Sequence, residues 1–276
     1  MSRAGLQRTK PTNPRALRLR VLARQQISPS FVRVTLGGPE LADLTPLDHD
    51  QWFRLFLPQP GQEQGLDRLP DTMSTFAYAR YLAIPAAVRP VLRNYTVRAL
   101  RAPGTAAAEL DIDIVLHGDG EEAGPASRWA RDCAPGDPAV IIDEGITVPA
   151  AEPGSEHLLI AEESGVPAVL GILRSLPRDA TGTALLEIPT PGDIQPDEAP
   201  DGVAVRWIVR TDPHATPGVA VLSALTETSF DADRVRVFTV GEQALPTGAR
   251  RALVARGVAK DRIVFCGYWR VNRASY

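Results

Sequence analysis

The segment "TVPAAEPGSE", residues 147–156, separates two halves of the chain that differ in their sequence pattern. Its content of Pro, Ala and Gly is typical of a connection between domains. Before it the chain contains short, alternating apolar stretches, whereas after it strand-like and helix-like stretches follow one another. We therefore predict a boundary near residue 150, with one domain over residues 1–150 and a second over residues 151–276.

The first half predicts an antiparallel barrel or sandwich, because its strands are short, are separated by Gly and Pro, and are accompanied by no long helical pattern. A short helix is expected at residues 124–133, with Pro125 suited to its first turn. Residues 68–90 form a longer connection, in which a short helix is one alternative. The strand-like stretches are "ALRLRVLARQQIS", "SFVRVTLGG", "QWFRLFLP", "RNYTVRAL", "ELDIDIVLHG" and "PAVIIDEG".

The second half predicts a parallel sheet with helices on its faces, because strands and helices alternate along it. Helical spacing relates Val166, Val169, Leu170 and Leu173, and a further helix is expected at "ALPTGARRALVARG". The segment contains no GxGxxG motif, so the standard dinucleotide fingerprint does not apply. The predicted strands are "HLLIA", "TALLEIP", "VAVRWIV", "RVRVFTV" and "RIVFCGYW".

Composition excludes several classes of protein. A net charge of -3 over 276 residues argues against nucleic-acid binding, which usually needs a basic face. No apolar run approaches the roughly 20 residues of a membrane helix, and the basic N-terminus lacks the features of a signal peptide. Cys133 and Cys266 form no metal-type spacing, and the four histidines are scattered. We expect a cytoplasmic protein with reduced thiols, no metal site, and neither nucleic acid nor membrane as a partner.

The stretch "RNYTVRAL", residues 93–100, carries arginines on both faces of an expected strand. Side chains alternate along a strand, so Arg93 shares a face with Tyr95 and Val97, while Arg98 shares the other with Thr96. A guanidinium beside a tyrosine in a half-buried strand indicates a planar, anionic ligand along the strand.

The stretch "LHGDGEEAGPASRWA" places small residues just before a helix start. Free backbone N–H groups and the positive end of the helix meet at such a point, which can bind phosphate. Ser127 can add a hydroxyl, and Arg93 can supply the charge. The alternative is an ordinary turn at Gly124 and Pro125 with Ser127 as an ordinary cap. Together with "RNYTVR", the pattern favours a dinucleotide site.

These motifs give the chain a resemblance to a known family. The segments "VLARQQISPSFVRVTLGGPELADL", "RNYTVR", "LHGDGEEAGPASRWARDCAPGD" and "GYWR" occur in the order seen in the siderophore-interacting proteins. These are flavin-dependent ferric-siderophore reductases related to the ferredoxin reductase superfamily. The resemblance implies an α+β chain of two domains: an N-terminal antiparallel FAD-binding β-barrel and a C-terminal α/β domain that binds NAD(P)H on a parallel sheet.

The resemblance also implies roles for residues of the first domain. Arg93 would pair with the FAD pyrophosphate, and Tyr95 would pack against the isoalloxazine. Thr96 would lie near the reactive N5 edge, so that Tyr95 and Thr96 take the catalytic positions. The remaining FAD-binding positions that it implies are Val97, Arg98, His117, Gly124, Pro125, Ala126 and Ser127.

In the second domain the resemblance rests on weaker matches. "AEESGVPAV" stands where the family usually has "G-D-E-T-A-x-P-A", with Gly165 in place of the usual alanine, and "TVGEQA" fits an "A-G-E" turn. Both could be plain strand-to-helix connections. Other departures are "DEGI" at residues 143–146, where "G-P-R-G" is frequent, and Val271 and Asn272 after "GYWR". The positions expected to face NAD(P)H are Glu162, Ser164, Gly241, Glu242 and Trp269.

The resemblance implies an enzyme that reduces a ferric siderophore with FAD and NAD(P)H, and we expect it to be a monomer. A siderophore already surrounds Fe(III) with hard oxygen ligands, so the protein needs no metal ligands of its own. The acidic stretch after the second strand of the second domain favours NADH over NADPH, and a ferredoxin-type protein is an alternative donor. Two other readings stay open: a general NAD(P)H:flavin or electron-transfer reductase, and a non-catalytic protein that binds a siderophore or flavin.

Overall fold

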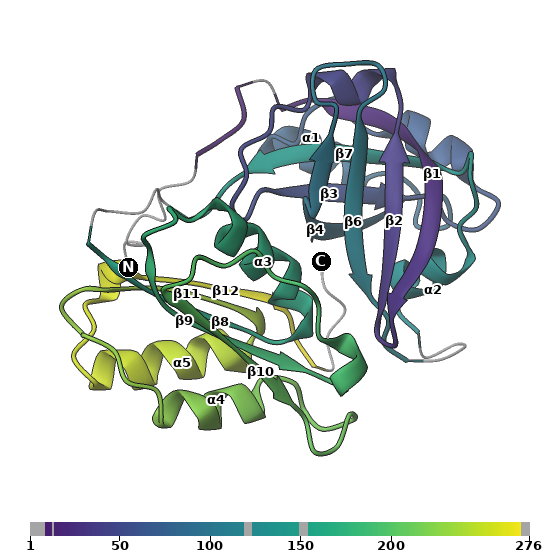
Figure 1. Ribbon diagram of the computed structural model, residues 1–276. Helices are drawn as coiled ribbons and strands as arrows, with labels where there is room; N and C mark the ends of the chain where they lie inside the picture. The colour runs from purple at the N-terminus through teal and green to yellow at the C-terminus, as the bar shows by residue number, and fades with distance from the viewer. Residues whose placement is uncertain (1–8, 13, 119–122, 149–153, 272–276) are drawn as a thin grey trace. The chain divides into compact units, whose positions relative to one another are not determined.

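Figure 1 shows a computed structural model of the chain, which describes residues 9–12, 14–118, 123–148 and 154–271. The chain divides into two compact units, one of Lys10–Leu47 and Gln51–Ile146 and the other of Asp48–Asp50 and Thr147–Ser275. We call them the barrel unit and the parallel-sheet unit. The boundary expected at residue 150 lies outside the described residues. Within the described ranges, no helix has both the length and the apolar character needed to cross a membrane.

The barrel unit contains a seven-stranded sheet in the order β4-β3-β7-β1-β2-β6-β5, in which every neighbouring pair is antiparallel. Alternating apolar residues of these strands form one core, which includes Leu19, Val34, Phe53 and Ile112. The antiparallel architecture expected from the short strands is confirmed. Its strands are β1 (Ala16–Ser28), β2 (Phe31–Gly37), β3 (Trp52–Leu57), β4 (Val91–Thr96), β5 (Ala99–Arg101), β6 (Glu109–Val115) and β7 (Pro138–Gly145).

The sheet closes into a barrel at Val97 and Arg98, which join its two outermost strands, β4 and β5. The Val97 N–H donates to the carbonyl of Gln51, just before β3, at 2.8 Å. The next N–H, that of Arg98, donates to the carbonyl of Asp111 in β6 at 2.9 Å. The expected single strand over residues 93–100 is therefore wrong, because consecutive amides pair with opposite ends of the sheet and the regular alternation stops between them.

The helices of the barrel unit are α1 (Thr75–Leu82) and α2 (Pro125–Asp132), with 3-10 turns η1 (Pro39–Asp43) and η2 (Glu63–Arg68). α1 is the helix that the sequence left open within residues 68–90. The Ser74 hydroxyl caps it by accepting the Ala77 N–H at 3.2 Å. The Tyr81 ring lies edge-on to Phe56, with ring centroids 5.7 Å apart, so α1 covers an outer face of the barrel. α2 confirms the helix expected at residues 124–133.

The parallel-sheet unit contains five parallel strands in the order β10-β9-β8-β11-β12. Figure 1 shows α3 on one face of the sheet and α4 and α5 on the other. The predicted parallel sheet with helices on its faces is confirmed. Its elements are β8 (Glu156–Ala161), η4 (Glu163–Gly165), α3 (Val166–Ser175), β9 (Thr181–Ile188), η5 (Pro191–Asp193), β10 (Val203–Val209), α4 (Val219–Thr226), β11 (Val235–Glu242), α5 (Ala244–Ala255), η6 (Lys260–Arg262) and β12 (Ile263–Trp269).

Helix α4 is missing from the sequence-based prediction. It buries Val221 and Leu225 but leaves Val219 62% exposed. Apolar residues therefore occur on its solvent side as well as on its buried side, and an amphipathic pattern does not stand out.

The strand order locates the place where a ligand binds in such a sheet. From β8 the chain adds β9 and β10 on one side, and then crosses to add β11 and β12 on the other. In open parallel sheets, ligands bind at the carboxyl ends of the strands, where the strand order reverses. We call the edge where β8 to β12 end the carboxyl edge. Its reversal point lies between β8 and β11.

Candidate functional site

Strand β4 carries the first group of predicted site residues. Tyr95 packs against the barrel core, and burial raises the pKa of its phenol despite the opposing effect of Arg93. Thr96 and Val97 are buried. Arg93 is half-buried, and its Nη1 donates to the carbonyl of Leu92 at 2.7 Å. The remaining N–H groups of its guanidinium can thus meet an anion.

Arg98 does not share the surroundings of Arg93. Its Nε lies 3.4 Å from Asp113, a buried carboxylate that also receives a bidentate pair from Arg33 at 2.7 and 2.8 Å. Because the strand breaks at Val97 and Arg98, the backbone of Arg98 pairs with β6 and does not continue the pairing of β4 with β3. Its ion pair links the residue between β4 and β5 to Asp113 in β6.

The start of α2 is built around a close contact between Gly124 and His117. A Cβ atom at Gly124 would lie 2.8 Å from Cε1 of the His117 ring, so a larger residue at this position would require the ring to shift. The buried Ser127 hydroxyl accepts the His117 N–H at 3.2 Å and donates to its carbonyl at 3.3 Å. Ser127 therefore ties the end of β6 to α2, and its hydroxyl is already used.

The first turn of α2 still presents backbone donors. Pro125 has no N–H, and the first N–H groups of a helix, here those of Ala126 and Ser127, lack acceptors within the helix. The helix contacts β4, β2 and β6, so its start and strand β4 belong to one region of the barrel. The structure thus brings together the two motifs that the sequence associated with FAD.

A groove of about 370 Å³ opens beside β4, on the outer face of the barrel. Arg54, on this face, pairs with Glu144 at 2.5 Å, and the buried Asp143 accepts the N–H of Gly145 at 3.0 Å. These contacts account for the acidic residues of "DEGI", which stand at the end of β7: Asp143 accepts the Gly145 N–H, and Glu144 pairs with Arg54. The groove is lined by Arg54, Met73, Ser74, Thr75, Tyr78, Leu92 and Asn94.

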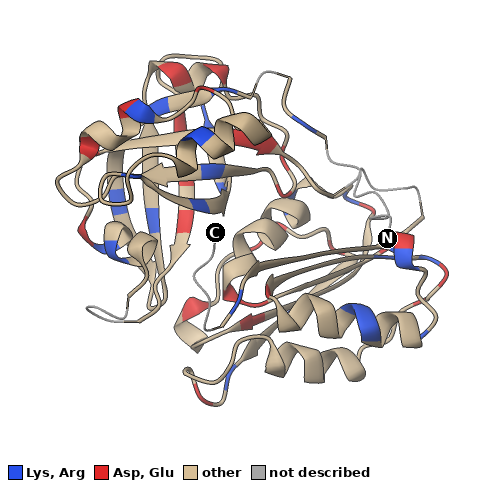
Figure 2. Cartoon of the chain, turned by 180° about the vertical axis from the view of Figure 1, so that it is seen from behind, with Lys and Arg blue, Asp and Glu red and all other residues tan. Residues whose placement is uncertain are grey.

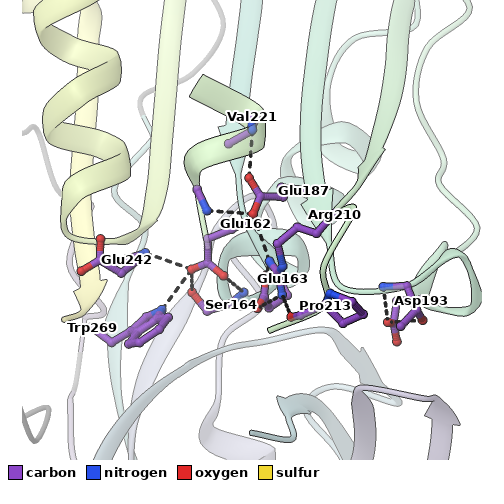
Figure 3. Close-up of polar contacts among 12 residues, drawn as sticks. Glu162, Glu163, Ser164, Glu187, Asp193, Arg210, Pro213, Val221, Glu242 and Trp269 are labelled. Atoms are coloured by element: carbon purple, nitrogen blue, oxygen red, sulfur yellow. Dashed lines mark hydrogen bonds and ion pairs between the residues drawn. The ribbon is translucent and has the colours of Figure 1, made fainter. Parts of the chain in front are cut away.

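In the parallel-sheet unit, Glu162 connects the ends of several strands (Figure 3). It follows β8, is fully buried, and its Oε1 accepts the N–H of Glu242 at 2.9 Å and the indole N–H of Trp269 at 3.0 Å. Its carboxylate also accepts the Ser164 hydroxyl and, at 3.0 Å, the Ser164 N–H. The predicted residues that follow β8 and those that end β11 and β12 therefore meet at the reversal point of the carboxyl edge.

Gly241 makes room for the Glu162 carboxylate. It has φ of +136°, and a Cβ there would lie 2.7 Å from Oε1 of Glu162. Burial, followed by the neighbouring Glu163, raises the pKa of Glu162 to about 8, against the hydrogen bonds from Ser164 and Trp269. A buried carboxyl with a raised pKa, such as that of Glu162, is frequent at functional sites.

The unusual Gly165 has a structural explanation. A Cβ at Gly165 would lie 2.8 Å from the Cβ of Ala161 and 2.6 Å from Cγ2 of Val240. Ala161 occupies the position where the family pattern has its glycine. The alanine and the glycine of that pattern have exchanged places, so the same space is filled from the strand instead of from the turn.

Arg210 was missed by the sequence analysis. It is buried at the end of β10 and makes a bidentate pair with Glu163 at 2.6 and 2.8 Å and a further bond to Glu187 at 3.0 Å. Figure 3 shows it between these two carboxylates. A lone arginine after an apolar strand reads as a surface residue, and the only hint was the isolated glutamate in "TALLEIP".

Acidic positions gather where the strands of the parallel-sheet unit end (Figure 2). Glu242 is buried there, and Val271 donates its N–H to the Glu242 Oε1 at 3.3 Å. Asn272, the other departure after "GYWR", lies outside the described residues. Among the residues that the structure describes, no group of His, Cys, Asp and Glu is arranged to hold a metal ion.

Comparison with known proteins agrees with both units. A family model described as siderophore-interacting FAD-binding domain matches residues 20–147, and one described as siderophore-interacting protein matches residues 154–272. Ferric vibriobactin reductase ViuB of Vibrio cholerae is 29% identical over 248 residues, which cover 90% of this chain and 86% of ViuB.

Solved structures show the same relationship. The siderophore-interacting protein SipS from Aeromonas hydrophila superposes with a TM-score of 0.73 at 30% identity, covering 95% of this chain and 94% of SipS. A ferredoxin NADP+ reductase from Neisseria gonorrhoeae, at 14% identity, has a TM-score of 0.62 over 93% of this chain and 100% of that chain. The chain therefore belongs to the siderophore-interacting protein family and has the ferredoxin-reductase-like fold.

Proposed function

We propose that the protein is an NAD(P)H-dependent flavin oxidoreductase that reduces the Fe(III) of a ferric siderophore. Bound FAD supplies the chemistry of accepting a hydride and returning single electrons. ViuB, a relative over most of the chain, is a ferric vibriobactin reductase. One observation carries the proposal. Helix α2, whose first N–H groups have no acceptor within the helix, contacts strand β4, which carries Arg93 and Tyr95.

The residues of the barrel fit FAD. Arg93 has N–H groups to pair with the pyrophosphate, and the Ala126 and Ser127 N–H groups can hold its oxygens. His117 and Gly124 shape this helix start, so that the loss of either changes the seat of the diphosphate. We assign residues 1–150 to FAD binding on this basis.

Tyr95 and Thr96 are proposed to position the isoalloxazine. Tyr95 presents a ring that the barrel core holds in place, and Thr96 follows it on the same strand before the break at Val97. A fixed ring beside the flavin would orient the reacting edge, which is the contribution expected of such side chains. Arg98 would act through its ion pair with Asp113, by fixing the strand break.

Residues 151–276 are proposed to bind NAD(P)H at the carboxyl edge. Glu162 holds Ser164, Glu242 and Trp269 in place there, and Gly241 provides the space. A ferredoxin-type donor remains a second candidate for the source of electrons. The substrate carries its own iron ligands, so no metal-binding residues are needed in the protein.

We also propose a monomer in the cytoplasm. Cys133 and Cys266 form no disulfide with each other. A general NAD(P)H:flavin reductase and a binding-only protein are the competing readings. Both predict that a ferric siderophore is no better an oxidant than other acceptors.

The decisive experiment is an anaerobic reduction cycle. The purified protein should be yellow, NAD(P)H should bleach its flavin, and a ferric siderophore should restore the colour as Fe(II) appears. Ferrozine, which traps Fe(II), should speed turnover because it removes the product. Faster reoxidation by a ferric siderophore than by free flavin or dyes would separate this activity from general flavin reduction. Reduced flavin that persists with every ferric chelate tried would end the siderophore assignment.

NADH should be preferred over NADPH by a modest factor, about three- to tenfold, because exposed like charges repel weakly in water. Asp197, Glu198 and Asp201 are exposed in the connection after β9, and no basic residue occurs between positions 187 and 201. Initial rates with each nucleotide over a range of salt concentrations would measure the preference, which should shrink as salt rises. A clear advantage of NADPH would show that a basic residue elsewhere binds the 2′-phosphate.

A further inference from the structure

Dinucleotide-binding sheets usually hold the diphosphate at a helix start. Unpaired N–H groups and the positive end of the helix meet there, at the carboxyl edge of the sheet. In the parallel-sheet unit, the turns and helices that follow β8, β9, β10 and β11 all begin at this edge. Whether they can seat a diphosphate depends on whether their N–H groups are open.

At the start of α3, next to the reversal point, the N–H groups of Ser164, Gly165 and Val166 are already bonded within the chain. The Ser164 N–H donates to the Glu162 carboxylate at 3.0 Å, and the Gly165 N–H donates to the Glu162 carbonyl at 2.8 Å. The Val166 N–H donates to the carbonyl of Glu163, and Pro167 has no N–H. Val166 and Pro167 are also buried, so a phosphate cannot approach.

At the other helix starts of this edge, carboxylates of the chain itself accept N–H groups of the first turn. Glu187 accepts the N–H groups of Gly218 and Val221, at the start of α4, each at 2.8 Å. Glu242 accepts the Ala244 N–H, at the start of α5, at 2.6 Å. After β9, Asp193 accepts the Thr190 N–H at 3.1 Å and its hydroxyl at 2.7 Å.

The carboxylates of Glu187 and Glu242 place negative charge where a diphosphate would have to bind. Glu187 is fully buried and Glu242 is 4% exposed, so solvent screens their charge little. The buried Arg210 offsets Glu163 and Glu187 only, since its ion pairs are with these two residues. Like charges at short range in such surroundings disfavour a second anion.

We propose that the protein recognises its nicotinamide donor through the nicotinamide half, and that the adenosine diphosphate half adds little to binding because Glu162, Glu187 and Glu242 occupy the helix starts that would seat its diphosphate. This inference rests on the proposed function, in which a reduced nicotinamide is the electron donor. It extends the class of donors beyond NAD(P)H to reduced nicotinamides that lack the adenosine half. Reduced nicotinamide mononucleotide, which lacks the adenosine half, should serve as a donor too.

The first test compares two donors on the FAD-loaded protein without oxygen. The second-order rate constant for flavin bleaching by reduced nicotinamide mononucleotide should lie within about tenfold of that for NADH, because a remote group that binds weakly contributes little to the rate. A larger advantage of NADH would overturn the proposal, since it would show that the adenosine half is held.

The second test measures binding of ADP-ribose to the FAD-loaded protein by calorimetry and needs no turnover. A Kd weaker than about 1 mM is expected, equivalent to little specific binding. A tighter value would overturn the proposal. If no nicotinamide donor bleached the flavin, the proposed function would fail. The ADP-ribose measurement would still decide whether the protein binds the diphosphate.

A pair of variants tests whether the charge of the Glu242 carboxylate weakens binding of the diphosphate. Glu242→Gln keeps an oxygen for the Ala244 N–H but removes the charge, so ADP-ribose should bind about three- to tenfold more tightly. The matched control is Glu156→Gln at the opposite end of β8, where the carboxylate accepts the Asp231 N–H at 2.9 Å. It makes the same change of charge at the other edge of the sheet and should leave ADP-ribose binding unchanged. Equal effects of the two variants, or no effect of Glu242→Gln, would contradict the assigned cause.

Discussion

Arg210→Met is expected to lower the free energy of unfolding of the parallel-sheet unit by about 3–5 kcal/mol, because it leaves buried carboxylates without their cation. Arg210 pairs with Glu163 and Glu187, and all three side chains are buried. Methionine fills much of the same volume, so the loss comes from charge more than from packing. Urea unfolding followed by circular dichroism would measure it, with flavin release reporting the barrel separately.

The matched control is Arg206→Met in β10, the strand that Arg210 directly follows. Arg206 is exposed, and its Nη1 lies 3.5 Å from the Thr228 hydroxyl, so this change should cost at most about 0.5 kcal/mol. Adding Glu163→Gln and Glu187→Gln to Arg210→Met should recover part of the loss, because the stranded charges are gone. A similar cost for Arg206→Met and Arg210→Met, or no recovery in the triple variant, would contradict the role given to the ion pairs.

Arg93→Ala is expected to weaken FAD binding at least roughly tenfold, since a charge-assisted bond to phosphate contributes about 1.5–3 kcal/mol. The fold should be retained, because the Arg93 contact in the structure is to the adjacent Leu92 carbonyl. Equilibrium dialysis of the apoprotein against FAD would give the dissociation constant, and thermal unfolding of the apoprotein would check the fold.

Arg20→Ala is the matched control for Arg93→Ala. Arg20 also lies on a barrel strand and donates to a backbone carbonyl, that of Gly136, at 2.8 Å, but it lies on β1. Its loss should leave FAD affinity unchanged. Unaltered flavin content in a well-folded Arg93→Ala protein would remove Arg93 from the site.

The departures from the family pattern show where sequence comparison reaches its limit. In the sequence, Gly165 in place of alanine suggests that the motif has lost a methyl group. The packing shows that the Ala161 side chain lies where a methyl group on Gly165 would be. The "DEGI" turn similarly reads as the loss of a basic group. In the structure these residues end β7, where Asp143 accepts the Gly145 N–H and Glu144 pairs with Arg54.

The sequence by itself determined the kinds of elements and the nature of the cofactor. Alternation in strands and apolar spacing in helices are local patterns, so the antiparallel and parallel sheets could be predicted from them. The "RNYTVR" motif and the start of α2 could be read in the same way, since each is a contiguous run of residues whose chemistry suits an anionic, planar ligand.

Tertiary structure alone decided how the charged residues are used. Arg210 and Glu163 are 47 residues apart in sequence, and Trp269 and Glu162 are 107 apart, so no local pattern could pair them. The break of the expected strand at Val97 and Arg98 has the same origin, because it exists only where the two ends of a seven-stranded sheet meet. Burial in a low-dielectric interior makes such pairings specific, and burial is a property of the folded chain.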